Sequence, residues 1–317
     1  MDILKLSPVF KDYIWGGNRL KDDFHLNTPY DKTAEAWMLA CHKDGMNRIE
    51  GGEFDQMTLS EVINRNDPER TAGSNALRFP YFPVLIKLID AYDNLSIQVH
   101  PDDEYARRVE NEFGKTEIWY VLDAADGAEL VYGFKESISK EEFKTAIENN
   151  TLLEKLNRVK VKKGDLFFIE AGTVHAIGKG ALIAEIQQNS NCTYRVYDYG
   201  RLGKDGKPRE LHIEKALDVS CTEPPKYGIK PLGEEEQHQG FLFQKLCRCD
   251  LFSVDRYQIN DSVTLCADQS SFHHILVIDG AGTVGGRTAV KGDSFFVPAG
   301  YGEYKIGGDI EILITRI

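Results

Sequence analysis

The sequence predicts a mainly β protein that folds as two small antiparallel barrels or jelly rolls in tandem, with a few short helices. Short runs of β-branched and aromatic residues, separated by glycine turns, fill most of the 317 residues, and this pattern is typical of such folds. The segment at residues 161–177 recurs in similar form at residues 289–306, and a repeated unit implies a repeated fold. A stretch rich in Pro, Gly and Glu at residues 222–240 lies between the two copies.

We place the domain boundary in this stretch. Residues 1–230 are predicted to form an N-terminal domain with helical segments, and residues 231–317 a C-terminal domain of short strands and glycine turns. Within the repeat, Gly164 aligns with Gly292, an offset of 128 residues.

The composition limits the classes of partner. The formal net charge is −12, and the basic residues form no stripe of the kind that binds a nucleic acid, whereas a phosphorylated small molecule needs only a few of them at one site. The N-terminus lacks the basic start and apolar run of a signal peptide, and no stretch reaches the length of a membrane span. We therefore expect a cytoplasmic protein without a nucleic-acid or membrane partner, whose six cysteines are free thiols. The composition sets no oligomeric state.

The elements can be assigned in chain order, beginning with a short strand at residues 34–40. Residues 58–66 are typical of a short helix with Thr58 or Ser60 as its cap. The continuous apolar run at residues 82–91 predicts a buried strand.

Beyond residue 100, helices and strands alternate. Residues 102–114 begin with carboxylates and predict a helix. Residues 117–124 and 128–134 are predicted to form a hairpin across the turn between them. Ser139 begins a capping box and therefore a helix, and strands follow from residue 159 to about residue 199.

Four polar residues in separate strands predict a metal site. In SIQVHPDD, Gln98 and His100 are two residues apart on a strand and so point to the same side. Glu117 and His175 follow in strands of their own. Nitrogen and oxygen ligands that converge from separate strands are the usual way to hold zinc with a position open for substrate. Any one of these residues alone would be explained more simply as a solvated or hydrogen-bonded polar residue.

The two copies differ at this site. His175 aligns with Glu303, and the second copy has nothing that resembles Gln98-x-His100. The C-terminal domain is therefore expected to lack metal ligands and to be structural.

Three charged residues are predicted to lie near the metal. Lys115 is two residues before Glu117 and shares its side of the strand, so it is a candidate for substrate contact or proton transfer. If residues 189–191 form a three-residue hairpin loop, Glu185 and Arg195 face each other across two strands. Arg195 suits a bidentate contact to a phosphate or to enediolate oxygens. Lys115, Glu185 and a metal-bound water all remain candidates for moving a proton.

The motifs resemble a known family. The spacing G-x5-E-x-G-x2-H from Gly164 to His175 resembles the second cupin motif, and the copy from Gly292 to Glu303 keeps the spacing without the histidine. More narrowly, SIQVHPDD, GKTE, EAGTVHAIG and AEIQQNSNCTYRVYDYGR are similar to the type I mannose-6-phosphate isomerases, in the short form that bacteria carry. The similarity runs through residues 1 to about 215.

This resemblance implies two tandem cupin-type jelly-roll barrels and a zinc-dependent aldose–ketose isomerase with one Zn²⁺ per chain. The reaction implied is the interconversion of mannose 6-phosphate and fructose 6-phosphate through a cis-enediol. The implied zinc ligands are Gln98, His100, Glu117 and His175. The implied catalytic residues are Arg195, Lys115 and Glu185, with Arg195 and Lys115 also binding the substrate. Gly114 departs from longer members, which can have a histidine at this position.

Two other readings fit part of the pattern. Two histidines and one carboxylate with open positions also suit Fe(II), as in an iron oxygenase. The second alternative is a cupin that binds a sugar or regulates another protein but catalyses no reaction. The glutamine ligand, together with Lys115 and Arg195, favours an enzyme of phosphorylated sugars over an iron oxygenase. The intact set of metal ligands disfavours a binding protein without turnover.

Overall fold

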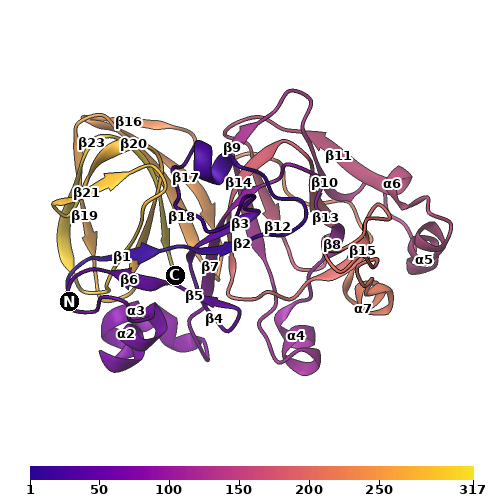
Figure 1. The fold of residues 1–317 in the computed structure, drawn as a ribbon, viewed down its shortest axis with the longest axis horizontal. Helices are drawn as coiled ribbons and strands as arrows, with labels where there is room; N and C mark the ends of the chain where they lie inside the picture. The colour runs from indigo at the N-terminus through magenta and orange to yellow at the C-terminus, as the bar shows by residue number, and fades with distance from the viewer.

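The computed structural model describes all of residues 1–317 (Figure 1). Two antiparallel sheets that face each other form one half of the fold. The six-stranded sheet has the order β12 (Leu166–Ile169), β9 (Glu117–Ala124), β14 (Ala181–Gln188), β7 (Val84–Asp90), β3 (Glu35–Leu39) and β2 (Val9–Lys11). The five-stranded sheet has the order β11 (Leu156–Lys160), β10 (Glu129–Phe134), β13 (His175–Ile177), β8 (Ile97–Val99) and β15 (Tyr194–Tyr197). Trp119 and Phe167 of the first sheet pack in one core with Leu130 and Ile177 of the second.

A third sheet of ten strands contains most of the C-terminal residues. Its main path is β16 (Glu236–His238), β17 (Phe241–Arg248), β18 (Ser253–Ile259), β23 (Gly302–Arg316), β20 (His273–Val284), β22 (Ser294–Val297), β1 (Leu4–Ser7) and β6 (Arg48–Glu50). Two further strands complete it, β19 (Ser262–Ala267) on β23 and β21 (Arg287–Val290) on β20. Because β1 and β6 come from the start of the chain, this sheet unites both sides of the predicted boundary. A separate ladder joins β4 (Cys41–His42) to β5 (Gly45–Met46).

The helices are short and lie outside the sheets (Figure 1). They are α1 (Arg19–Asp22), α2 (Leu59–Arg65), α3 (Pro68–Ala72), the 3-10 helix η1 (Ser74–Arg78), α4 (Asp103–Val109), α5 (Lys140–Glu148), α6 (Leu152–Lys155) and α7 (Ile213–Val219). Phe143 of α5 and Ala216 of α7 pack with Val99 and Val131 on the outer face of the five-stranded sheet. No helix is both long enough and apolar enough to span a membrane.

The six-stranded sheet is the middle layer of the molecule. One face meets the five-stranded sheet, and on the other Ile86 and Ile118 pack with Leu276 and Leu313 of the ten-stranded sheet. All seven residues of β7 are buried, which explains the continuous apolar run in its sequence. Figure 1 shows the resulting order, with the ten-stranded sheet at one end and α5, α6 and α7 at the other.

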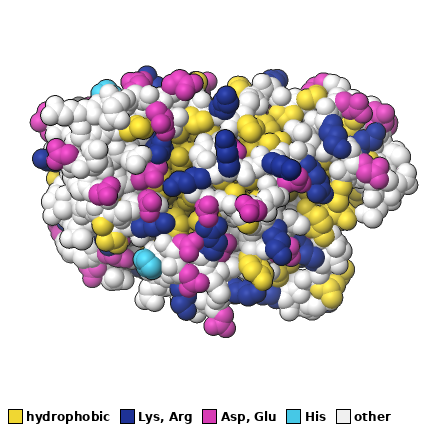
Figure 2. Space-filling view, turned by 90° about the horizontal axis from the view of Figure 1, so that it is seen from above, with side chains coloured by type: hydrophobic (Ala, Val, Ile, Leu, Met, Phe, Trp, Pro, Cys, Tyr) yellow, Lys and Arg dark blue, Asp and Glu magenta, His cyan; other side chains and the backbone are white.

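Charged side chains of both signs are spread over the surface. On the face shown in Figure 2, basic and acidic side chains are interspersed around an apolar band, and the basic ones form no continuous stripe. On this face, the excess of acidic residues forms no single patch.

The prediction of a mainly β chain is confirmed, but its sheets do not close into barrels. Each sheet has free edge strands, such as β12 and β2 in the six-stranded sheet. The strand pairing therefore gives open sheets that pack on one another. The division of the chain into two tandem jelly rolls stays a prediction.

The internal repeat is confirmed in three dimensions. β12 and β22 occupy equivalent positions in the two copies. In each copy an aspartate closes the preceding turn, since Asp165 accepts a hydrogen bond from the Lys162 N–H at 2.9 Å and Asp293 accepts one from the Val290 N–H at 3.0 Å. Gly164, with a φ of 91°, permits the backbone conformation that this turn requires.

The predicted hairpin between residues 117–124 and 128–134 is wrong. β9 pairs with β12 and β14, whereas β10 pairs with β11 and β13. The turn itself exists, because the Ala128 N–H donates to the Ala125 carbonyl at 2.9 Å. The chain crosses from one sheet to the other there, because Val121 and Leu130 approach the same core from opposite sides. A local turn signal does not distinguish such a corner from a hairpin.

The helix starts agree with the sequence signals. Thr58 caps α2 and Ser139 caps α5, each in a complete capping box. Asp102 caps α4 by accepting a hydrogen bond from the Tyr105 N–H at 2.9 Å.

We predict that Ser139→Ala lowers the free energy of unfolding by about 1 kcal/mol, because α5 loses its side-chain cap. The Ser139 hydroxyl accepts a hydrogen bond from the Glu142 N–H at 3.1 Å. Urea unfolding followed by circular dichroism measures the change. The matched control is Ser74→Ala in η1, where the exposed serine forms no side-chain cap, and here the change should stay within about 0.5 kcal/mol. Equal losses in the two variants would contradict the capping role.

Candidate active site

Three of the predicted metal ligands meet between the two facing sheets. His100 follows β8, Glu117 begins β9, and His175 begins β13. One ligand atom from each lies within 4.8 Å of the others, and the three side chains are at most 1% exposed. His175 pairs with Gln98 across two strands of one sheet, while Glu117 approaches from the other sheet.

Backbone contacts direct both imidazoles into this cluster. His100 Nδ1 lies 2.8 Å from the Cys192 carbonyl oxygen, and His175 Nδ1 lies 2.8 Å from the Thr173 carbonyl oxygen. An Nδ1–H that donates to a carbonyl leaves Nε2 with a free lone pair. The two Nε2 atoms are 3.1 Å apart, so both imidazoles present a potential metal-binding nitrogen to the same point.

The Glu117 carboxylate fits a metal because its buried Oε1 lacks a hydrogen-bond partner, while its Oε2 has Lys115 as a partner. Lys115 Nζ lies 2.5 Å from Glu117 Oε2 and 3.0 Å from His100 Nε2, so a cation already contacts two of the potential ligands. Burial and the nearby Glu185 carboxylate raise the pKa of Glu117 to about 7. Burial also lowers the pKa of His175 to about 3, and the Lys115 charge acts in the same direction.

The fourth predicted ligand, Gln98, lies at the edge of the cluster. Its Nε2 is 3.4 Å from His175 Nε2, and its side chain also lines a cavity of about 270 Å³. The amide could therefore offer its oxygen to the same metal. The donor set of two imidazoles, one carboxylate and one amide suits a divalent cation.

The three predicted catalytic residues line this same cavity. They are Lys115, Glu185 and Arg195. The cavity adjoins the buried cluster through Lys115 and Gln98. It is also bordered by Tyr13, Trp15, Glu35, Lys87 and Arg209. A small polar molecule in this cavity would touch charged groups of both signs.

Glu185 is held ionised by its neighbours. Its Oε1 lies 2.9 Å from Lys87 Nζ and 3.7 Å from Lys115 Nζ, and its Oε2 accepts a hydrogen bond from Trp119 Nε1 at 2.9 Å. Burial alone would raise the pKa of this carboxyl, but the two ammonium groups outweigh burial and lower it to about 2. Glu185 is therefore a fixed negative charge beside Lys115.

Arg195 has a partly free guanidinium in the cavity. Its NH1 donates to the Glu210 carbonyl at 2.8 Å, while its buried Nε has no partner. Burial and the neighbouring Arg209 guanidinium lower the pKa of Arg195. Arg209 is itself held by Asp198, to which its NH2 donates at 2.5 Å. An anion would satisfy both the free N–H and the excess positive charge.

The hairpin reasoning that paired Glu185 with Arg195 is wrong, although both residues line the cavity. Glu185 lies opposite Lys87 and Trp119 in the six-stranded sheet, and Arg195 lies opposite Gln98 in the five-stranded sheet. Between them the chain crosses from one sheet to the other instead of turning back. The two side chains meet because the sheets face each other.

Sequence reasoning missed Lys87, which is 4% exposed and contacts Glu185. Its pKa is raised, because the Glu185 and Glu35 carboxylates outweigh the effect of burial. The available signal was a single lysine in the apolar run at residues 82–91. A charge at such a position requires a partner in the interior. Arg209 was also missed, and it lies in a polar loop without a comparable signal.

Gly114 has no space for a side chain. A Cβ atom there would lie 2.4 Å from the Asp103 nitrogen and 2.5 Å from the Asp102 carbonyl carbon. The first turn of α4 therefore packs directly on the backbone that leads to Lys115. This contact explains why the position that can hold a histidine in longer members holds glycine here.

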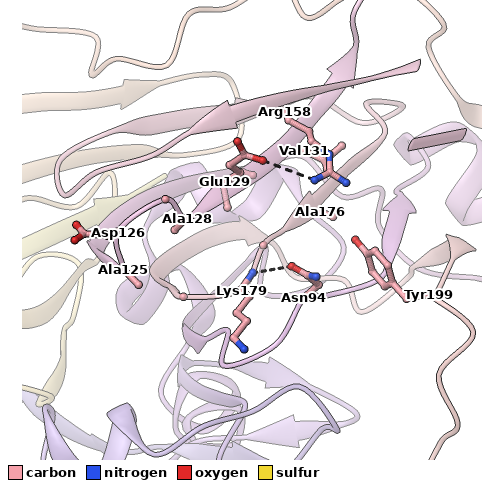
Figure 3. Close-up of a pocket in the computed structure, with 14 residues that line it drawn as sticks. Asn94, Ala125, Asp126, Ala128, Glu129, Val131, Arg158, Ala176, Lys179 and Tyr199 are labelled. Carbon is pink, nitrogen blue, oxygen red and sulfur yellow. Dashed lines mark hydrogen bonds and ion pairs between the residues drawn. The ribbon is translucent and has the colours of Figure 1, made fainter. Parts of the chain in front are cut away.

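A second cavity, of about 390 Å³, lies on the outer side of the five-stranded sheet (Figure 3). Two pairs of its polar groups contact each other, since Arg158 lies 3.7 Å from Glu129 and the Lys179 N–H donates to Asn94 at 2.8 Å. None of the predicted site residues lines it. The candidate active site is therefore the smaller cavity above His100, Glu117 and His175.

Two family models match parts of this chain. Residues 3–134 match the family model for the catalytic domain of type I phosphomannose isomerase, and residues 243–317 match that for the cupin domain of mannose-6-phosphate isomerase. The mannose-6-phosphate isomerase ManA of Bacillus subtilis is 41% identical, with 99% of this chain and 98% of the relative covered. The mannose-6-phosphate isomerase of Streptococcus mutans is 38% identical, with 99% of this chain and 98% of the relative covered.

Solved structures agree in fold. A crystal structure of the mannose 6-phosphate isomerase from Bacillus subtilis superposes with a TM-score of 0.92 at 36% identity, covering 100% of both chains. The apo form of the mannose 6-phosphate isomerase from Salmonella typhimurium gives a TM-score of 0.74 at 18% identity over 99% of both chains. At that identity the second comparison concerns the fold alone.

We predict that metal binding to the metal-free protein releases close to one proton at pH 6 and close to none at pH 8. The reason is that Glu117, with a pKa of about 7, must ionise to bind, whereas His175 is already neutral. The apparent affinity should therefore fall about tenfold per pH unit below pH 7 and level off above it. Calorimetry with Zn²⁺ in buffers of different ionisation enthalpy counts the protons. In the control variant Glu117→Gln the proton release should disappear, and an unchanged release would contradict this assignment.

Proposed function

The chain belongs to the type I mannose-6-phosphate isomerases, a family of aldose–ketose isomerases, and we propose that it uses zinc and proceeds through a cis-enediol. The observation that carries the proposal is the buried His100, Glu117 and His175 cluster beneath a cavity lined by Lys115, Glu185 and Arg195. The substrates proposed for it are mannose 6-phosphate and fructose 6-phosphate, as the names of its relatives indicate.

One zinc ion per chain would be held by His100, Glu117, His175 and the Gln98 amide oxygen. The isomerisation moves no net electrons, so a metal without redox chemistry suits it. Bound there, zinc would supply a Lewis acid that polarises the sugar carbonyl and orients the C1 and C2 oxygens. The two neutral imidazoles and the single carboxylate leave the site with a net positive charge when the metal is present, which favours an enediolate.

We assign the proton transfer between C1 and C2 to Lys115, whose ammonium group would first give up its own proton so that the free amine can accept the proton from carbon. Its Nζ lies at the boundary between the cluster and the cavity, 3.0 Å from His100 Nε2. Glu185 is a weak base with a pKa of about 2, and a base works best when its pKa is near the working pH. Glu185 therefore orients Lys115 and Lys87 rather than removing the proton itself.

Arg195 would bind the phosphate group of the substrate. Its unpartnered Nε and the nearby Arg209 provide the positive charge that a phosphate requires. Placing the phosphate at this end of the cavity leaves C1 and C2 of an open-chain sugar free to reach the metal cluster. The anchor and the reacting carbons would then be bound at once, which restricts the motion of a flexible substrate.

The division into a catalytic domain at residues 1–230 and a ligand-free cupin-like domain at residues 231–317 is also a proposal. It is supported by the position equivalent to Glu117 in the second copy, where His273 Nδ1 lies 2.6 Å from the Tyr304 hydroxyl. A cytoplasmic location is proposed from the substrate, since phosphorylated sugars do not cross membranes unaided.

We predict that the purified protein converts mannose 6-phosphate to fructose 6-phosphate, loses this activity on chelation, and regains it when Zn²⁺ is added back. The reason is that the substrate oxygens need a Lewis acid at the buried cluster. A coupled assay for fructose 6-phosphate measures the rate, with and without oxygen. Turnover that survives complete chelation, or that requires oxygen and Fe²⁺, would contradict the proposal.

We predict that Arg195→Ala lowers kcat/KM by about 10- to 100-fold through loss of a charged phosphate contact, while zinc content stays at one per chain. Steady-state kinetics and metal analysis measure the two effects. The matched control is Arg158→Ala, which removes an arginine from the outer cavity and should leave both values unchanged. Joint loss of zinc and activity in Arg195→Ala would show a structural role instead.

A further inference from the structure

The segment that crosses between the two facing sheets carries a backbone group that contacts the metal cluster. This crossover segment, residues 189–193, joins β14 of the six-stranded sheet to β15 of the five-stranded sheet. Its Cys192 carbonyl oxygen lies 2.8 Å from His100 Nδ1. Asn191 and Thr193 of the same segment line the cavity of about 270 Å³. The position of this short segment therefore affects both a metal ligand and the cavity wall.

The contact with Cys192 fixes which nitrogen of His100 carries the proton. A carbonyl oxygen can only accept a hydrogen bond, so Nδ1 must carry the hydrogen. On the other side of the ring, Nε2 lies 3.0 Å from Lys115 Nζ, and an ammonium group can only donate, so Nε2 must present its lone pair. Both contacts select the tautomer that binds a metal through Nε2. Without the Cys192 carbonyl at this place, the ring would lose the contact that fixes its orientation.

Glu112 holds the crossover segment from outside the cavity. It lies in the connection between α4 and β9 and is not one of the residues that line the cavity. Its Oε2 accepts hydrogen bonds from the Asn191 N–H at 3.1 Å and from the Ser190 hydroxyl at 3.3 Å. The Ser190 oxygen in turn accepts a hydrogen bond from the Cys192 N–H at 3.2 Å. Two hydrogen bonds in series therefore lead from the Glu112 carboxylate to Cys192.

The same carboxylate is tied to the β4–β5 hairpin. Glu112 Oε1 lies 2.5 Å from Lys43 Nζ, and Glu112 Oε2 lies 3.5 Å from His42 Nε2. Burial alone would raise the pKa of Glu112, but His42, Lys43 and the Asn191 N–H outweigh burial and lower it to about 2. An ionised acceptor forms stronger hydrogen bonds than a neutral one. Glu112 is thus a fixed anchor between the hairpin and the crossover segment.

Other contacts hold the two ends of the crossover segment. At its start, the Asn189 side chain donates to the Phe82 carbonyl at 2.8 Å, and just after its end the Tyr194 hydroxyl donates to Glu110 at 2.8 Å. Between these two anchors, the Asn191 N–H and the Ser190 hydroxyl converge on one oxygen of Glu112. Removing that oxygen would leave two donors without this partner, directly before the carbonyl that contacts His100.

We propose that Glu112 is a positioning residue for the metal site, because it fixes the crossover segment so that the Cys192 carbonyl directs His100 Nε2 toward the metal. This inference rests on the proposed metal site and extends it beyond the ligands. Groups that hydrogen-bond to a metal-bound histidine contribute about 10- to 100-fold to metal affinity, and Glu112 acts one contact further away, so we expect an effect of about 10-fold.

The first test measures the affinity of the intact protein for Zn²⁺ by competition with a chelator. In Glu112→Ala the dissociation constant should rise about 10-fold. Glu112→Gln should bring it back to within about threefold of the unmodified chain, because the amide oxygen still accepts from the crossover segment. The matched control is Lys43→Ala, which removes the exposed ion-pair partner but leaves the hydrogen bonds to the segment, and its dissociation constant should stay within about twofold.

The second test reads the tautomer of His100 in the metal-free protein. NMR of the imidazole nitrogens distinguishes a protonated nitrogen from an unprotonated one, and His100→Gln identifies the signals of His100. In the unmodified chain the proton should lie on Nδ1, and in Glu112→Ala a fraction with the proton on Nε2 should appear. His175 is the internal control, because its Nδ1 faces the Thr173 carbonyl, which takes no part in the contacts of Glu112.

Three results would overturn the proposal: an unchanged zinc affinity in Glu112→Ala, an unchanged His100 tautomer in that variant, or an equal loss of affinity in Lys43→Ala. If Glu112→Ala does not fold, Ser190→Ala takes its place, because it breaks the link from Glu112 to the Cys192 N–H, and the expected loss of affinity is about threefold. Neither measurement involves a sugar. An unmodified chain that binds no zinc would contradict the proposed function, and the tautomer would still decide the role of Glu112.

Discussion

The site depends on one carboxylate that is fully removed from water between two sheets. Burying an unpaired charge costs several kcal/mol, so Glu117 requires a cation close by. Lys115 supplies one from two residues away, and the neighbouring imidazoles offer their Nε2 atoms to a second. Ionised Glu117 therefore requires positive charge beside it, and a metal ion at this point would supply that charge. The same cation would stabilise negative charge on a substrate in the cavity above.

The sandwich of two sheets makes this arrangement possible. His100 and His175 come from the five-stranded sheet, and Glu117 and Glu185 come from the six-stranded sheet. Lys87 points into the space between the two facing sheets, where it is buried and pairs with Glu185. The C-terminal strands cover the other face of the six-stranded sheet, where Ile86 and Ile118 pack with Leu276 and Leu313.

The sequence predicted the site better than it predicted the path of the chain. The two-residue spacing correctly put Lys115 beside Glu117, because that contact is local. Hairpin reasoning failed for Glu185 and Arg195, because a turn leads equally well into the same sheet or into the opposite one. Only long-range packing decides between these outcomes. For the same reason, the pairing of β1 with β22 had no signal in either segment.

X-ray absorption spectroscopy of the zinc-loaded protein tests the central claim most directly, because it reports the atoms bound to the metal. The account predicts a first shell of nitrogen and oxygen at about 2.0–2.1 Å, with the multiple scattering of two imidazoles and no sulfur. The shell should change when fructose 6-phosphate is added, since its oxygens reach the open position. A sulfur shell at about 2.3 Å would contradict the account, because the metal would then be bound by cysteines and not by His100, Glu117 and His175.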